Sequence, residues 1–242
     1  MSDLILKMSD VDFSYDEIKV LDGFSMEVYK GEVFVIAGSN ESGKSSILKL
    51  CVGLLEPNRG EVILKGVNIY ESTNVDIRGL RLDIGYLFQH PALLSNMTVY
   101  DNVALPLRYH TNLSEDDIRE RVEEKLNLLG IIKESKVFPA SLSYNKRRLS
   151  GIARAIIMNP ELLIFDEPAA GLDPIGYRTV VDFIKRLKND FKKTMLITVN
   201  SATGAMAFGD RVGILKNGRF VFTGSPDDLR RSEDLYVKGL FF

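Results

Sequence analysis

The chain has 242 residues, of which 45% are hydrophobic and 26% are charged, and 31 Lys and Arg against 33 Asp and Glu give a formal net charge of −2. This length can bury a core without disulfide or metal staples, and the balanced charge argues against disorder and against a basic nucleic-acid footprint. The longest apolar runs fall far short of the ~18 residues of a membrane span, and we expect no secretory signal in the N-terminal sequence MSDLILKMSD.

Short apolar runs alternate with helix-period segments along most of the chain, which is typical of a sheet joined by crossover helices. Alternation in Phe24–Val28 and the apolar-centred run Glu61–Lys65 predict antiparallel strands before and after the first buried strand, Val33–Ala37. A helix is expected at Ser45–Val52. It contains the only cysteine, Cys51, which we interpret as a packed core thiol in a reducing compartment.

The remaining buried strands are predicted at Ile84–Phe88, Leu162–Phe165, Thr194–Val199 and Val212–Leu215. Residues 91–158 contain several helix patterns and few strand signals, so we expect a helical lobe there, with Ser114 and Asp117 at the start of one helix. The C-terminal tail, residues 225–242, ends in the apolar run YVKGLFF, which either packs on the chain itself or docks on a partner. We expect a single α/β domain over residues 1–242.

One motif carries the strongest functional signal. The sequence GSNESGKS at residues 38–45 matches the pattern G-x-x-x-x-G-K-[ST], and it follows a buried strand and precedes a helix. In this pattern the glycines let backbone N–H groups surround phosphate oxygens, Lys44 supplies a positive charge, and the Ser45 hydroxyl ligates magnesium. The sequence therefore predicts a nucleotide-phosphate site.

Two carboxylates follow the predicted strand Leu162–Phe165. Asp166 is placed to hold the magnesium shell, and Glu167 to orient or deprotonate an attacking water. An apolar run ending in Asp-Glu is weak evidence by itself. Together with the loop at residues 38–45 it indicates a nucleoside triphosphatase.

Further residues indicate the family. Tyr15 lies upstream, where an aromatic ring can stack on adenine, Gln89 ends the strand Ile84–Phe88, Leu142-Ser143 precede a helix, and Gly171-Leu172-Asp173-Pro174 follow the carboxylates. This order resembles the ATP-binding subunits of ABC transporters over nearly the whole chain. The resemblance implies a P-loop NTPase fold with a RecA-like parallel sheet, an antiparallel β subdomain and an inserted helical subdomain. It also implies that ATP is bound by Tyr15, Gly38, Ser39, Asn40, Ser42, Gly43, Lys44, Ser45, Ser46 and Ser143.

The resemblance also implies roles and partners. Gln89 and Glu167 would be catalytic, and Mg²⁺ would be held by Ser45, Gln89 and Asp166. The partners would be a separate integral-membrane permease and a second ATP-binding subunit, with no nucleic acid. The chain would be located at the cytoplasmic face of the inner membrane. The segments PLRYHTNLSEDDIRERVEEKL and SEDLYVKGLFF, with the run GLDPIG, are more narrowly similar to Mla/MCE-type phospholipid transporters.

Three positions depart from the family pattern. The signature, usually LSGGQ, is Leu142-Ser143-Tyr144-Asn145-Lys146 here, Val199 stands where a switch histidine is usual, and Glu41 replaces a glycine of the phosphate loop. Losing a positioned acid–base group costs ~10²–10⁴ in rate. We therefore expect ATP binding with weak or absent turnover.

Two other functions stay open. The three departures favour a catalytically impaired subunit that binds ATP as a partner or scaffold in the same complex. A soluble ABC protein acting outside transport would need two cassettes or a long coiled-coil insertion, and the sequence contains neither.

Overall fold

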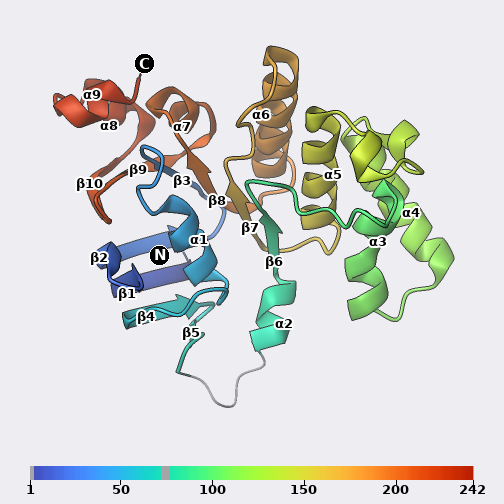
Figure 1. Ribbon diagram of the computed structural model, residues 1–242, viewed down its shortest axis with the longest axis horizontal. Coiled ribbons are helices and arrows are strands. Elements are labelled where there is room, and N and C mark those ends of the chain that lie inside the picture. Colours follow the sequence, from blue (N-terminus) through green and yellow to red (C-terminus); the bar gives the residue numbers. More distant parts are fainter. Residues whose placement is uncertain (1–2, 72–76, 242) are drawn as a thin grey trace. The chain divides into compact units, whose positions relative to one another are not determined.

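The computed structural model describes residues 3–71 and 77–241 and divides the chain into two compact units (Figure 1). The first unit comprises Met1–Arg81 and Lys185–Phe242, and the second comprises Leu82–Ile184. The C-terminal tail belongs to the first unit, but its last residue, Phe242, lies outside the described residues.

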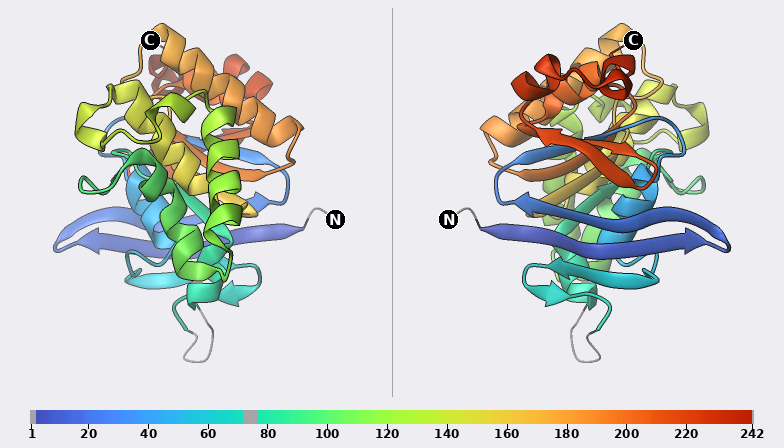
Figure 2. Two further views of the ribbon diagram at one scale, coloured as in Figure 1. Left: turned by 90° about the vertical axis from the view of Figure 1, so that its right-hand side faces the viewer. Right: turned by 90° about the vertical axis from the view of Figure 1, so that its left-hand side faces the viewer.

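The first unit contains an antiparallel sheet in the order β2-β1-β4-β5. Its strands are β1 (Leu4–Tyr15), β2 (Ile18–Tyr29), β4 (Arg59–Leu64) and β5 (Val67–Asn68). The predicted strand Phe24–Val28 is confirmed as part of β2, and Glu61–Lys65 is confirmed as part of β4 up to Leu64, where β4 ends. Sequence analysis missed β1, which lies beside β2 in Figure 2. A register shift between Met8 and Val11 moves its buried side chains from even to odd positions, so the alternation is interrupted.

A second group of strands in this unit carries the phosphate loop. The order is β10-β9-β3-β8, and the bounds are β3 (Val33–Ala37), β8 (Thr194–Val199), β9 (Arg211–Lys216) and β10 (Arg219–Gly224). β3 pairs in parallel with both β8 and β9, and β9 and β10 form an antiparallel hairpin. Every residue of β3 and β8 is buried, which explains their unbroken apolar runs.

Four short helices complete the first unit: α1 (Lys44–Cys51), α7 (Ala202–Phe208), α8 (Pro226–Arg231) and α9 (Leu235–Gly239). α1 packs on the antiparallel sheet, because the Cys51 Sγ lies 3.7 Å from the Met8 Sδ of β1. Complete burial raises the pKa of the Cys51 thiol far above its ordinary value, which confirms the expected core thiol. Two further helices, α2 (Ile77–Leu82) and α6 (Pro174–Asn189), run across the sequence boundaries of the units.

The second unit combines two parallel strands with helices. β6 (Ile84–Leu87) pairs with β7 (Leu162–Asp166), and the expected helical segment contains α3 (Val99–His110), α4 (Glu115–Leu128) and α5 (Tyr144–Ile156), with short 3-10 turns at Ile132–Glu134 and Pro139–Ser141. α3 packs against α4 and α5 (Figure 1). Ser114 and Asp117 form the predicted capping box of α4. The parallel strands, antiparallel sheet and helical segment confirm the expected α/β fold class.

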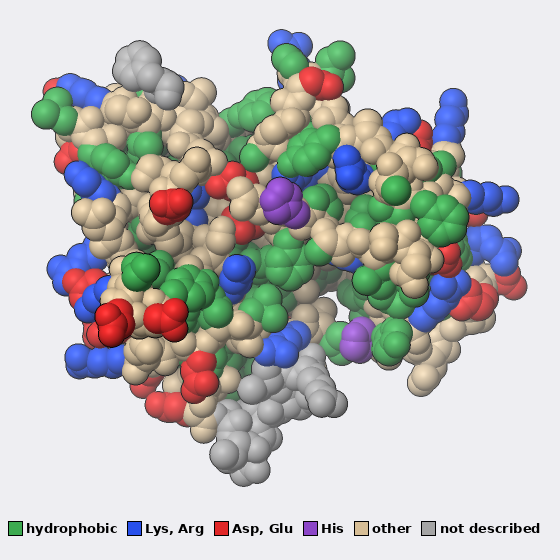
Figure 3. Space-filling view, in the orientation of Figure 1, with side chains coloured by type: hydrophobic (Ala, Val, Ile, Leu, Met, Phe, Trp, Pro, Cys, Tyr) green, Lys and Arg blue, Asp and Glu red, His purple; other side chains and the backbone are tan. Residues whose placement is uncertain are grey.

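The surface agrees with the balanced composition. Acidic and basic side chains are interspersed on the face shown in Figure 3. Within residues 3–71 and 77–241, none of the helices combines the length and apolar character needed to cross a bilayer.

Candidate functional site

The loop between β3 and α1 has the geometry that its glycines predict. A Cβ on Gly38 would lie 2.6 Å from the Leu215 carbonyl oxygen, so only glycine fits there. Gly43, the N-cap of α1, has φ +102°, a left-handed conformation that glycine adopts without strain. The Gly38 N–H donates to the Val199 carbonyl at 3.3 Å, which ties the start of the loop to the end of β8.

Lys44 folds back inside this loop. Its side chain is buried, and the Nζ donates to the carbonyl oxygens of Gly38 at 2.9 Å and Ser39 at 2.8 Å. The Ser42 Oγ beside it is buried and has no hydrogen-bond partner among the described residues. A buried cation next to an unsatisfied hydroxyl and a helix N-terminus fits a phosphate group, which supplies acceptor oxygens and negative charge.

Tyr15 lies close to the helix that follows the loop. The Ser46 Oγ donates to the Tyr15 Oη at 3.4 Å, and the Tyr15 ring, 44% exposed, packs edge-on against Phe13. An exposed ring held beside the phosphate loop suits the expected adenine platform. Ser45, at the start of α1, is partly exposed and is the hydroxyl expected to hold Mg²⁺.

The outer part of the loop is exposed at Ser39, Asn40 and Glu41. Glu41 has φ +63°, a left-handed conformation that a non-glycine residue adopts at a cost of ~1–2 kcal/mol. Its carboxylate is in solvent, so the family's usual glycine is replaced here by a strained residue whose charge faces outward.

The carboxylates belong to the second unit, and the structure joins one of them to the predicted glutamine. Asp166 ends β7, Glu167 follows it with φ +48°, and both are buried. The Gln89 Nε2 donates to the Glu167 Oε2 at 3.4 Å, across 78 positions of sequence. A buried carboxylate in an unusual backbone conformation beside an amide is the arrangement expected of a water-orienting pair.

The altered signature is bonded within the second unit. Ser143 caps α5 by accepting the Lys146 N–H, and the Lys146 ammonium is paired with Glu134. The Tyr144 Oη accepts a 2.6 Å bond from the Arg148 Nη2 and donates to the Ala170 carbonyl at 3.3 Å.

The next signature residue bonds to the loop after the carboxylates. The Asn145 amide donates to the Asp173 carboxylate at 2.8 Å. The Gly176 N–H, and then the Asn145 amide, hold the pKa of Asp173 below its ordinary value. Two of the residues that replace Gly-Gly-Gln, Tyr144 and Asn145, therefore connect the start of α5 with residues 170–173.

The predicted residues thus fall into two sets. The first unit brings together the loop 38–45, Ser46 and Tyr15, and the second brings Gln89 to Glu167, with Asp166 adjacent in sequence and Ser143 at the start of α5. Val199, in the first unit, ends β8 and contributes its backbone carbonyl to the phosphate loop.

Sequence reasoning missed two residues in this region. Arg148 is completely buried, and its Nε has no hydrogen-bond partner among the described residues. Its four-residue spacing from Tyr144 in a helix is the signal that could have indicated the contact. Tyr236, in the apolar tail, contacts the phosphate loop. The apolar character of the tail was the only sequence signal of a contact there.

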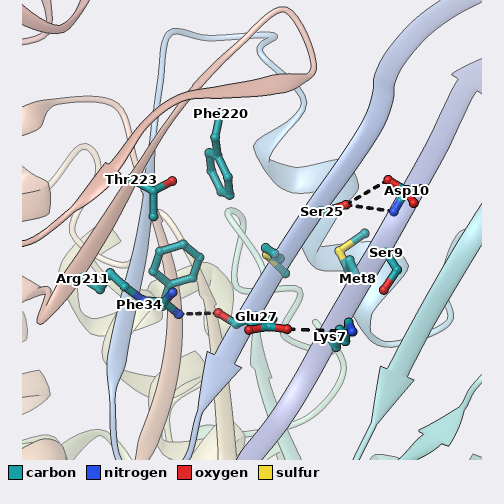
Figure 4. A pocket seen from close by; sticks show the side chains of 11 residues that line it. Lys7, Met8, Ser9, Asp10, Ser25, Glu27, Phe34, Arg211, Phe220 and Thr223 are labelled. Atoms are coloured by element: carbon teal, nitrogen blue, oxygen red, sulfur yellow. Dashed lines mark hydrogen bonds and ion pairs between the residues drawn. The ribbon is translucent and has the colours of Figure 1, made fainter.

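The first unit also has an open pocket of about 420 Å³ beside the antiparallel sheet (Figure 4). Met8 and Phe34 are among its lining residues, and the charged residues Lys7 and Arg211 of the lining form ion pairs within the chain. Arg211 pairs with Glu32 at 2.8 Å and lies 4.5 Å from the Phe34 ring centroid. We interpret this pocket as a packing gap between the antiparallel sheet and the strands β3, β9 and β10.

Comparison with known proteins shows the family. Residues 21–170 match the ABC transporter family. The chain is 34% identical over 225 residues to the probable ribonucleotide transport ATP-binding protein mkl of Mycobacterium leprae, covering 93% of this chain and 65% of that protein. It is 32% identical over 237 residues to the intermembrane phospholipid transport system ATP-binding protein MlaF of Haemophilus influenzae, covering 98% of this chain and 90% of that protein.

A solved structure has the same fold. It is described as the dimeric structure of a bacterial ABC transporter cassette, and it aligns with a TM-score of 0.86 and 26% identity over 92% of this chain and 99% of that chain. These matches support an ABC-type ATPase of the P-loop class. The family match covers more than half of the chain, and the chain belongs to the ABC transporter family, whose ATP-binding subunits it resembles in sequence and in fold.

Proposed function

We propose that this chain binds Mg-ATP through the loop 38–45 and couples it to phospholipid transport by a separate integral-membrane permease. The observation that carries the nucleotide part is Lys44, buried inside its loop beside the unsatisfied Ser42 Oγ. Lys44 and the N–H groups at the start of α1 hold the phosphates. Tyr15 supports the adenine, and the other contacts are those expected for Gly38, Ser39, Asn40, Ser42, Gly43, Ser46 and, from the facing subunit, Ser143.

Mg²⁺, when bound, neutralises charge on the phosphate oxygens. Ser45, Gln89 and Asp166 are the residues that would hold it. Glu167 orients or deprotonates the attacking water, and Gln89 restrains Glu167 through their 3.4 Å contact. The chain works as one nucleotide-binding domain and pairs with a second ATP-binding subunit, a second copy or a related chain. The dimeric structure of a related cassette supports this pairing.

Substitution of Lys44 tests the nucleotide site. We expect Lys44→Ala to abolish the thermal stabilisation that millimolar Mg-ATP gives the wild type, because binding only to the folded state stabilises it. Lys49→Ala, later in the same helix, is the matched control and should retain the shift. A folded wild type without any ATP-dependent shift would rule out the phosphate site.

The phospholipid assignment is supported by the MlaF relative, which matches this chain over nearly all of both lengths. The relative described as a probable ribonucleotide transport protein is the competing precedent. Purification of the chain from membranes, followed by mass identification of its companions and of bound lipid, distinguishes them. A permease that retains phospholipid supports the proposal, whereas a permease without lipid, or a ribosome, contradicts it.

We propose that the permease docks on residues 89–110, at the cytoplasmic face of the inner membrane. Leu94 is 41% exposed and Tyr109 is 77% exposed in this segment. Arg108 is unsuitable as a probe, since it bonds to Asp101 and Glu115 and stabilises α3 against α4. Tyr109→Glu should weaken co-purification of the permease and leave Mg-ATP binding unchanged, with Tyr109→Phe as control. Equal assembly of both variants would exclude this surface.

The second candidate is the catalytically impaired partner or scaffold, favoured by Tyr144, Asn145, Lys146 and Val199. Under it, Mg-ATP binds with ordinary affinity but turnover is low. Steady-state rates of the isolated chain and of its complex, with Glu167→Gln as the zero control, separate the two. Turnover of ~1–10² s⁻¹ that Glu167→Gln removes would exclude the impaired partner.

A further inference from the structure

The C-terminal helix α9 contacts the phosphate loop through one side chain. The Tyr236 Oη lies 3.5 Å from the Ser39 backbone nitrogen, 3.3 Å from the Ser39 Oγ and 3.2 Å from the Leu215 carbonyl oxygen. A phenol has one proton to donate and can accept two bonds. Donation to the Leu215 carbonyl therefore leaves the Oη to accept the N–H and the hydroxyl proton of Ser39.

Tyr236 is held firmly enough to restrain this loop. Asp234 caps α9 by accepting the N–H groups of Tyr236 and Val237, and Val237 is completely buried. The Leu240 carbonyl accepts the Ala202 N–H at 2.8 Å, which ties the end of α9 to α7. Lys216 lies 4.5 Å from the centroid of the Tyr236 ring, within cation–π range.

The Tyr236 side chain contacts the phosphate loop near two positions whose backbone is sterically restricted, Gly38 and Glu41. The Leu215 carbonyl that accepts from Tyr236 is the atom that a Cβ on Gly38 would strike at 2.6 Å. Tyr236 therefore connects β9 to the first turn of the loop. Glu41, two residues after Ser39, has a left-handed backbone conformation. The outer half of the loop therefore contains a strained residue whose conformation neighbouring contacts must maintain.

We propose that Tyr236 is a positioning residue of the nucleotide site. It orients Gly38 and Ser39 so that the loop stays in the shape that receives phosphate, and it makes the C-terminal helix part of the ATP site. This inference rests on the proposed binding of Mg-ATP by the loop. It adds a residue outside the P-loop motif, 197 positions from its partner in the sequence.

The test measures Mg-ATP dissociation constants and steady-state kinetics for the full chain. Tyr236→Phe keeps the ring over Lys216 and removes only the hydroxyl. We expect a three- to tenfold weaker affinity, about what the loss of one net hydrogen bond produces, and a raised KM with kcat within about twofold. The melting temperature without nucleotide should change little, which a merely structural role would not predict. Leu235→Ala, whose side chain is 86% exposed in the same helix, is the control.

A double-mutant cycle locates the effect. Ser39→Ala and Tyr236→Phe together should lose less than the sum of the single losses, since both remove the contact between the Ser39 Oγ and the Tyr236 Oη. Tyr236→Phe with wild-type affinity, while Lys44→Ala has lost binding, would overturn the positioning role. Lys44→Ala with wild-type affinity would instead overturn nucleotide binding by the loop, so the two failures are distinguishable.

Discussion

Tyr144→Phe should destabilise the chain, because the Tyr144 hydroxyl is the best hydrogen-bond partner of a buried charge. Arg148 is completely buried, its other two bonds, to the Phe88 and Ala170 carbonyls, are 3.4 Å long, and its Nε has no partner among the described residues. Substitution by Phe keeps the ring near the guanidinium and removes only the hydroxyl, which accepts the 2.6 Å bond from Arg148 and donates to the Ala170 carbonyl.

The magnitude follows from these contacts. A hydrogen bond to a charged group contributes about 1.5–3 kcal/mol, and the weak bond to the Ala170 carbonyl adds about 0.5–1 kcal/mol. We expect the free energy of unfolding to fall by about 2–4 kcal/mol. For a chain of this size each kcal/mol lowers the melting temperature by roughly 2–4 °C. The expected fall is thus roughly 4–16 °C.

Urea unfolding of wild type, Tyr144→Phe and Tyr109→Phe measures this effect. Tyr109 is 77% exposed, so its substitution should change stability by no more than about 0.5 kcal/mol. If Tyr144→Phe behaved like Tyr109→Phe, the hydroxyl would not stabilise Arg148 and the argument would be wrong.

This prediction bears on repair of the signature. Replacing Tyr144-Asn145-Lys146 by Gly-Gly-Gln removes the Arg148 acceptor and the Asn145–Asp173 bond. The repaired chain should be less stable than wild type. The ATP turnover rate of the repaired chain, with and without Val199→His, must therefore be measured at a temperature at which that chain is folded. A gain for the combined repair above the sum of the single gains would show that both departures limit turnover.

Three further predictions follow from buried or paired groups. The Cys51 thiol should react with a thiol reagent only after unfolding, because burial raises its pKa, and Mg-ATP should slow the reaction; rapid labelling of the folded chain would contradict this. The lowered pKa of Asp173 implies a stabilising contribution that is complete above its unfolded value of about 4 and lost as pH falls through the folded pKa. Asn145→Ala should raise the pKa of Asp173 in a carboxyl NMR titration. An unchanged pKa would mean that the Asn145–Asp173 bond does not lower it. Asn102 is completely buried, accepts the Leu94 N–H and donates to the Leu94, Met97 and Thr98 carbonyls. Asn102→Leu should therefore lower the free energy of unfolding, measured in urea, by about 2–4 kcal/mol. A loss below about 1 kcal/mol would mean that water replaces the bonds of the Asn102 amide.

The sequence by itself determined the features whose physical cause is local. The phosphate-loop motif is eight consecutive residues that follow a buried strand and enter a helix, and Gly43 within it is required by its own left-handed backbone conformation. β3 and β8 were predicted at their observed bounds because strands buried on both faces have unbroken apolar runs. The capping box of α4 likewise depends on residues three apart.

Only the tertiary structure decided which distant side chains meet. Tyr236 and Ser39 are 197 positions apart, and Gln89 and Glu167 are 78 apart, so no spacing rule joins them. The packing of α3 beside α4 likewise places Arg108 between Asp101 and Glu115. Strand β1 escaped detection because its register shift breaks the alternation that pairing with β2 and β4 accommodates. In each case the deciding contact forms only when separate elements pack, and a linear pattern contains no record of that packing.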